Sequence, residues 1–149
     1  MVSADEIVAL QDRLTLLWHG TADGQQSSAP VNSDDVWLDQ VARQHRANFD
    51  LWHIEDEARA PRVSDAELAA VKRRIDQTNQ LRNDLVEELD RNLLAWLEAR
   101  GLPKAAAPMN SESPGLIIDR LSILALKIDV YKRQVPTDRG LASGSSCSR

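Results

Sequence analysis

Two long stretches of this sequence place apolar residues three and four positions apart, the spacing of a helix that buries one face. The stripe between residues 34 and 59 consists of Leu38, Val41, His45, Phe49, Trp52 and Asp56. The stripe between residues 64 and 100 consists of Leu68, Val71, Ile75, Thr78, Arg82, Leu85, Val86, Leu89, Leu93 and Trp96. No strand-like alternation of useful length occurs elsewhere. The sequence therefore predicts an all-α fold, a bundle of about four long helices.

Three polar side chains stand at core-facing positions of these stripes, namely His45, Asp56 and Arg82. A buried charge costs several kcal/mol unless it is paired. We therefore expect Arg82 to form a salt bridge with Asp56, or with another carboxylate of the second or the last helix. These positions indicate where a site would lie, and they do not identify a reaction.

Capping signals give the bounds of the four predicted helices. The third has the strongest start, with Ser64 as cap and Glu67 three residues later. The predicted helices are Asp5–Trp18, Ser33–Ala60, Ser64–Arg100 and Gly115–Ile128, the last preceded by the cap Ser113. Residues 20–32 are expected to form a mobile loop and residues 101–113 a linker. The fourth helix is apolar on most faces, so we expect it to be the most buried.

The end of the chain differs from the rest. Asp129–Gln134 reads DVYKRQ, which one reading frame of a transposon end used in sequencing-library preparation encodes, and residues 135–149 have no helical period. We predict a helical domain over residues 1–128, truncated at its C-terminus, and a non-native, disordered tail over residues 129–149, through which the helix continues for a few residues at most. A natural disordered tail is the alternative.

Truncation would leave part of the fourth helix uncovered. The apolar residues expected on its exposed face come from Ile117, Leu121, Leu124 and Ile128. Such a patch invites self-association.

Composition excludes several classes of protein. The net charge of −5 argues against a surface for nucleic acid or for an anionic membrane. No apolar run approaches the roughly 18 residues that span a bilayer, and the acidic N-terminus is not a signal peptide. The single cysteine excludes an intramolecular disulfide. A cytoplasmic location is the expectation.

Carboxylates and one histidine suggest a metal site. His53 and Asp56 are neighbours on a helix, but two ligands do not make a site. Glu87 and Asp90 resemble the acidic pair of helical nucleotide pyrophosphatases, which hold Mg²⁺ between facing helices. The candidate ligands are therefore His53, Asp56, Glu87 and Asp90, and their oxygen atoms favour Mg²⁺ or Mn²⁺. The alternative is a solvated face with Glu87 paired to Arg91.

Three blocks carry a family resemblance: FDLWHIEDEAR (Phe49–Arg59), VKRRIDQTNQLRNDLVEELD (Val71–Asp90) and NSESPGLIIDRLSILALKI (Asn110–Ile128). Together they resemble an uncharacterised bacterial, all-helical family, the domain of unknown function DUF4254. That family has Thr where this chain has Ser113, and it continues in helical style past Ile128. The resemblance implies no activity, but it implies an association with cell-envelope polysaccharide loci beside glycosyltransferases.

Polar residues inside these blocks define the candidate site, a pocket between the second, third and fourth helices for a small anionic ligand such as a sugar nucleotide or phosphosugar. The candidate catalytic residues are His53, Asp56 and Asp76. The candidate ligand-binding residues are Arg59, Lys72, Asn79, Arg82, Asn83, Asp119, Arg120 and Lys127.

Two other functions remain open. The chain could be a structural or adaptor bundle with a buried salt-bridge network, or a Mg²⁺-dependent hydrolase resembling nucleotide pyrophosphatases. A cavity between the second and third helices favours a ligand site, whereas a dry, fully paired network favours the adaptor. The sequence does not decide whether the protein is an enzyme.

Overall fold

The computed structural model describes residues 3–20, 36–59, 61, 64–102, 104 and 106–135. Their regular structure is helical throughout, which confirms the all-α prediction. The helices are α1 (Ala4–Gly20), α2 (Val36–Ala58), α3 (Asp65–Glu98) and α4 (Pro114–Gln134). The predicted helix start at Ser33 lies outside the described residues, and so do the loop after Gly20 and the tail beyond Val135.

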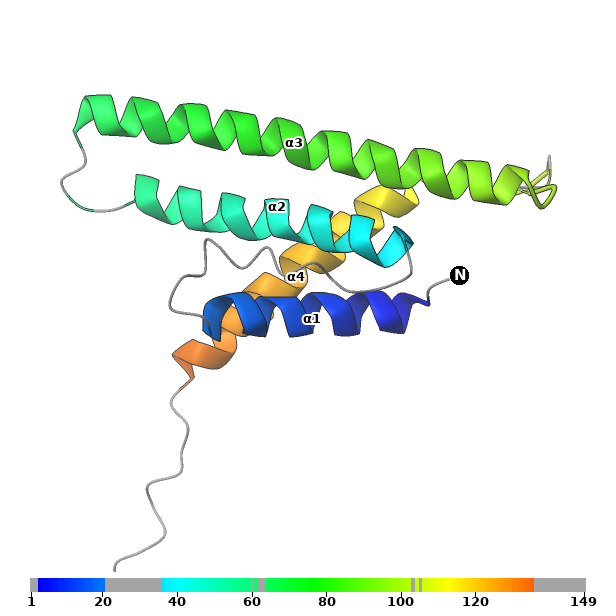
Figure 1. Cartoon of the computed structure of the whole chain (residues 1–149), viewed down its shortest axis with the longest axis horizontal. Coiled ribbons are helices and arrows are strands. Elements are labelled where there is room, and N and C mark those ends of the chain that lie inside the picture. Colours follow the sequence, from blue (N-terminus) through cyan, green and yellow to red (C-terminus); the bar gives the residue numbers. More distant parts are fainter. Residues whose placement is uncertain are drawn as a thin grey trace, which may run out of the picture.

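The helices form a bundle in which α2 has the central place. It packs against α1, α3 and α4, and α4 in turn contacts the other three helices. Figure 1 shows α3 lying along α2 and α4 crossing the bundle obliquely. The core consists of Ile7, Leu10, Leu14, Trp18, Val41, Ala42, Phe49, Leu89, Ile118 and Leu126. No helix in the described ranges is long and apolar enough to cross a membrane.

Local signals fix the helix ends as predicted. The Ser64 side chain accepts a hydrogen bond from the amide of Glu67, and the Glu67 carboxylate accepts one from the amide of Ser64 at 2.8 Å. Ser113 caps α4, with Pro114 in its first turn. Beyond α3, Gly101 adopts a φ of 69°, a conformation that favours glycine.

The prediction that the fourth helix is the most buried is wrong. Nine residues of α2 are buried, against seven of α4. The reason is geometric: α2 lies between α1 and α3, whereas α4 packs through one face only. Its exposed apolar residues include Ile117, Leu124 and Ile128, as predicted, while Leu121 is half-buried.

We expect helix four to continue for only a few residues past Ile128, and in the structure α4 runs through the first six residues of the predicted tail, to Gln134. Asp129 is buried, and its Oδ2 lies 2.9 Å from His19 Nδ1 and 2.8 Å from Arg133 Nε. The contact with His19 holds the end of α4 against α1. The domain boundary at residue 128 and the origin of the tail stay predictions.

Gly115 lies at the closest approach of α4 to α3, where its amide donates a hydrogen bond to Asp90 Oδ1 at 2.7 Å. A Cβ at this position would lie 2.6 Å from the carbonyl oxygen of Val86 and 2.9 Å from the Asp90 carboxylate. We expect Gly115→Ala to lower the free energy of unfolding by about 1–3 kcal/mol, because a backbone carbonyl cannot move aside. Urea denaturation measures this.

Gly20→Ala is the matched control, because a Cβ there would meet nothing within 4 Å. It should leave stability unchanged or raise it slightly, since alanine favours helix. Equal denaturation midpoints for Gly115→Ala and the parent chain would contradict the close approach.

Candidate functional site

A network of polar side chains crosses the centre of the bundle, where an apolar core would be expected. Its buried members come from α1, α2 and α4, and they are Gln11, Thr15, Gln44, His45, Asn48, Asp119 and Ser122. Arg82 of α3 joins them from the edge of the core. The network therefore links all four helices.

Asp119 is the acceptor at the centre of this network. Its side chain receives hydrogen bonds from Gln44 Nε2 at 2.6 Å and Asn48 Nδ2 at 2.9 Å. Arg82 donates through Nε at 2.8 Å and through Nη2 at 2.5 Å, so the guanidinium binds both carboxylate oxygens. This hydrogen bonding raises the pKa of Arg82. The predicted salt bridge of Arg82 is thus confirmed with a carboxylate of α4, and Asp56 is not its partner.

His45 is fully buried between two hydroxyl groups. Its Nε2 lies 2.9 Å from Thr15 Oγ1, and its Nδ1 lies 2.7 Å from Ser122 Oγ. Because Thr15 already donates its proton to the carbonyl of Gln11, we assign the His45 proton to Nε2 and let Nδ1 accept from Ser122. Burial lowers the pKa of His45 to about 4, so the imidazole is neutral at pH 7.

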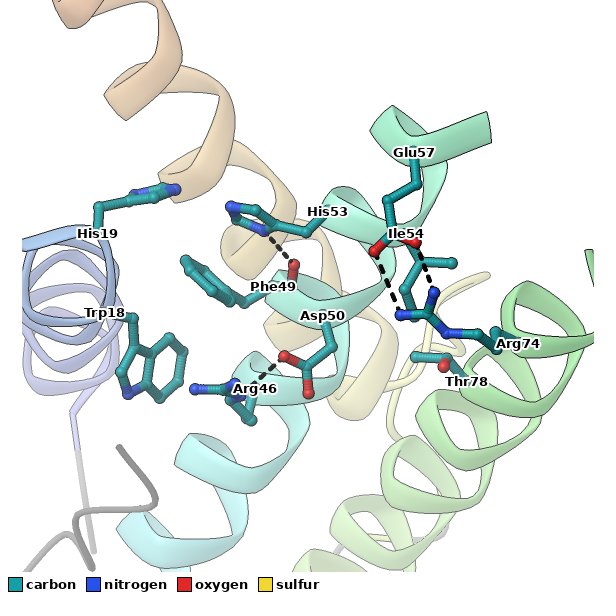
Figure 2. A pocket seen from close by; sticks show the side chains of 10 residues that line it. All are labelled: Trp18, His19, Arg46, Phe49, Asp50, His53, Ile54, Glu57, Arg74 and Thr78. Atoms are coloured by element: carbon teal, nitrogen blue, oxygen red, sulfur yellow. Dashed lines mark hydrogen bonds and ion pairs between the residues drawn. The ribbon is translucent and has the colours of Figure 1, made fainter. Parts of the chain in front are cut away.

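A cleft of about 540 Å³ lies beside this network, between α1, α2 and α3 (Figure 2). Its lining residues are Trp18, His19, Arg46, Phe49, Asp50, His53, Ile54, Glu57, Arg74 and Thr78. The Trp18 ring stacks on His45 with the ring centroids 5.2 Å apart. The indole therefore separates the cleft from the buried network.

The imidazole rings of His19 and His53 lie next to each other inside the cleft, beside the ring of Phe49. Figure 2 shows His19 and His53 pointing toward one another beside Phe49, and the centroids of the two imidazoles are 5.2 Å apart. His53 Nδ1 lies 2.8 Å from the carbonyl of Phe49 and must donate to it, which leaves Nε2 of the neutral ring as an acceptor. Burial lowers the pKa of His19, and Arg133 lowers it further, against the opposing effect of Asp129.

Each guanidinium of the cleft is paired with a carboxylate. Arg46 Nε lies 2.9 Å from Asp50 Oδ1, and its guanidinium stacks over the rings of Trp18 and Phe49. Arg74 of α3 contacts both carboxylate oxygens of Glu57 on α2, at 2.5 and 3.2 Å. The cleft thus presents positive and negative groups side by side over an aromatic wall.

The structure divides the candidate residues predicted from the sequence. His53 lines the cleft, while Arg82 and Asp119 belong to the buried network, with Asn79 Oδ1 3.5 Å from Arg82 Nη1. Apart from the candidate metal ligands Glu87 and Asp90, the remaining candidates are exposed: Asp56, Arg59, Lys72, Asp76, Asn83, Arg120 and Lys127. Arg82 and Asp119, which were expected to line a pocket between α2, α3 and α4, bind each other in the network, and the cleft that His53 lines is on the α1 side.

The core-facing position predicted for Asp56 is wrong. The buried face of α2 ends with Leu51 and Ile54, and Asp56 is exposed and bonded to Arg59 Nη1 at 2.9 Å. Arg120 is likewise on the surface, where it pairs with Glu112.

The predicted metal ligands are not brought together. Glu88 of α3 contacts Gln40 and Arg43 of α2, so Glu87 and Asp90 lie near that end of the helix. Asp56 is 13 residues beyond Arg43, a separation of about 20 Å along a helix. Across the described part of the chain, no group of three or more His, Cys, Asp or Glu residues could hold a metal ion.

Sequence reasoning missed much of the network and most of the cleft. The network members that it missed are Gln11, Thr15, Gln44 and Ser122. Gln11 and Thr15 lie four residues beyond the buried Ile7 and Gln11 respectively, a spacing that could have indicated the core face. No sequence pattern links His19, Arg46 and Arg74, which approach one another only in the fold.

Comparison with known proteins gives a family and no function. The family DUF4254, described as protein of unknown function, matches residues 38–146, which include most of α2 and all of α3 and α4 and make up more than half of the chain. No curated protein and no solved structure matches. On the extent of the family match, the chain belongs to DUF4254, a family of proteins of unknown function.

Proposed function

We propose that the cleft between α1, α2 and α3 binds a small ligand that carries both an anionic group and hydroxyl groups, such as a phosphosugar or sugar nucleotide. The observation that supports this proposal is the lining, which joins two imidazoles, two guanidinium groups and two carboxylates to an aromatic wall. The volume of about 540 Å³ falls within the range of roughly 300–1,000 Å³ typical of small-molecule sites.

Different lining residues would bind different groups of the ligand. Arg74 and Arg46 would bind the anion, and Asp50 and Glu57 would accept hydrogen bonds from the hydroxyl groups. The existing ion pairs do not prevent this, because partly exposed pairs contribute only about 0–1 kcal/mol. Trp18 and Phe49 are almost fully buried and form the floor of the cleft, on which the Arg46 guanidinium lies.

His53 is suited to proton transfer, because its Nδ1 is held by a carbonyl and its Nε2 is left as an acceptor. It keeps the acid–base role expected from the sequence. Asp56 and Asp76 lie outside the cleft lining and are left out of the proposal. The cell-envelope polysaccharide context and the cytoplasmic location are parts of this proposal that rest on the family resemblance and on composition. A Mg²⁺-dependent hydrolase is not proposed, because two of its candidate ligands lie near the end of α2 and the other two lie on α3 near the start of α2.

The buried network supports a second role for the chain as a structural or adaptor bundle. Arg82 and Asp119 satisfy each other inside the protein, and neither lines the cleft. The two roles are compatible, because the network fixes the helices whose outer residues form the cleft.

Nuclear magnetic resonance titration of the full chain with glucose 1-phosphate and with UDP-glucose tests the ligand proposal. We expect both probes to shift the Trp18 indole and the His19 and His53 imidazole signals. Arg74→Gln should weaken binding about tenfold or more, because it removes a charged hydrogen-bond donor. Arg59→Gln is the matched control, since Arg59 is exposed just beyond the end of α2 and lies outside the cleft.

Three results would contradict the proposal. The probes could leave the cleft signals unchanged up to millimolar concentration, the shifts could be confined to residues outside the cleft, or Arg59→Gln could weaken binding as much as Arg74→Gln. Any one of them would leave the structural role as the better account.

A further inference from the structure

The exposed face of α4 has the spacing of a coiled-coil seam. Its apolar residues alternate at intervals of four and three, and they are Ile117, Leu121, Leu124, Ile128 and Tyr131. Leu121 is half-buried, and the other four side chains are 39–65% exposed. An average spacing of 3.5 residues keeps such a stripe facing a second helix along its whole length. Ile117 and Leu121 line a hollow that they share with Ile7 of α1 and Trp96 of α3, while Leu124, Ile128 and Tyr131 are exposed.

A face of α1 borders the stripe. Gln11 Nε2 donates to the carbonyl of Ile118 at 3.2 Å, and His19 contacts Asp129, so the two helices lie side by side and run in the same direction (Figure 1). Next to Gln11 and His19 on the surface of α1, and farther from the core, lies a row of side chains spaced three or four residues apart. These residues are Asp5, Val8, Asp12 and Leu16. All four are exposed, including Leu16 at 63%. Together with the stripe they form what we call the α1–α4 face.

The two edges of the α1–α4 face carry opposite charge. Asp5 and Asp12 lie on the α1 edge, and Arg120 and Lys127 flank the stripe on the α4 edge. Arg120 pairs with Glu112, whereas no ion pair joins Asp12 or Lys127 to any residue that the structure describes. The face is thus complementary to a copy of itself turned by a two-fold rotation.

We propose that a second copy of this chain covers the α1–α4 face in a two-fold dimer, with α4 of each copy packed against α1 of the other. The apolar stripe of one copy would then bury Val8 and Leu16 of its partner, and the basic edge would meet the acidic one. A two-fold contact is closed, so assembly stops at the dimer. Antiparallel packing of α4 directly on a second α4 is disfavoured, because it would bring the basic edges together.

Sedimentation velocity and light scattering of the full chain over a concentration series test this proposal. We expect a dimer for the parent chain and a monomer for Leu124→Glu, which places a charge in the middle of the stripe. Leu81→Glu is the matched control, because Leu81 is 50% exposed on α3, outside the face, and should leave the dimer intact.

A charge swap tests the orientation independently of folding. Asp12→Lys and Lys127→Glu should each weaken the dimer by about tenfold, because each sets like charges against one another. The double variant Asp12→Lys/Lys127→Glu restores opposite charges and should restore the dimer. The proposal fails if the parent chain is monomeric at every concentration or forms open-ended assemblies. It also fails if Leu81→Glu disrupts the dimer as much as Leu124→Glu does, or if the dimer of the double variant is as weak as the dimers of the single variants.

Discussion

Arg82→Leu should lower the free energy of unfolding by about 3–5 kcal/mol, because it leaves the carboxylate of Asp119 buried without a counter-charge. Asp119 is 4% exposed, and after the substitution only the neutral amides of Gln44 and Asn48 would still donate to it. Domains of this kind are stable by only about 5–15 kcal/mol, so the loss would be a large fraction of the total. Urea denaturation at neutral pH measures the effect.

Two further variants show whether the orphaned charge is the cause. In Arg82→Leu/Asp119→Asn the acceptor for Gln44 and Asn48 is kept while the charge is removed, so most of the lost stability should return. Arg120→Leu removes a guanidinium that is 61% exposed and should change stability by less than about 0.5 kcal/mol. A loss for Arg82→Leu no larger than that for Arg120→Leu would show that the network contributes little.

The same variant separates the two proposed roles of the chain. Arg82 does not line the cleft, so Arg82→Leu should leave the affinity for glucose 1-phosphate unchanged at temperatures where the variant is folded. A loss of affinity without a loss of stability would instead place the ligand at Arg82, in the pocket predicted from the sequence.

The sequence predicted the helices well because their signals are local. The cap at Ser64, the proline at the start of α4 and the 3.6-residue period of α2 and α3 each depend on a few neighbouring residues. His45 and Arg82 could be identified for the same reason, since each interrupts an apolar stripe. Asp56 was misplaced because the stripe was extended past Ile54, the last buried residue of α2.

The partners of these residues depend on how the helices cross, which no single helix encodes. Asn48 and Ser122 are buried because α4 crosses α2 obliquely, and this brings Ser122 Oγ within 2.9 Å of Asn48 Nδ2. The cleft depends likewise on the register of α2 against α3, which joins Glu57 to Arg74, 17 residues apart in the chain. Sequence periodicity predicts which face of a helix is buried. It does not predict how α4 crosses α2 or the register of α2 against α3.

Acidification from pH 6.5 to pH 4 should destabilise the protein through His45 by on the order of 3 kcal/mol, because its pKa falls from 6.5 to about 4 on folding. Within this range the unfolded chain binds a proton on His45 and the native protein does not. The contribution of neutral His45 to the free energy of unfolding is therefore complete above pH 6.5 and decreases as the pH falls. It is lost near pH 4, where the buried ring protonates as well. The physical cause is that neither Thr15 nor Ser122 offers a charge to an imidazolium in this buried position.

Urea denaturation across this pH range, for the parent chain and for His45→Gln, isolates the effect. Glutamine does not titrate, so the variant should lose the part of the pH dependence that belongs to His45, whatever its stability at neutral pH. The unfolding free energy of the parent chain should therefore decrease relative to that of the variant as the pH falls from 6.5 to about 4. Parallel pH profiles would contradict the burial argument. So would a nuclear magnetic resonance titration in which the pKa of His45 lies near its ordinary value, since an imidazolium cannot form there unless water or a carboxylate comes into contact with the ring.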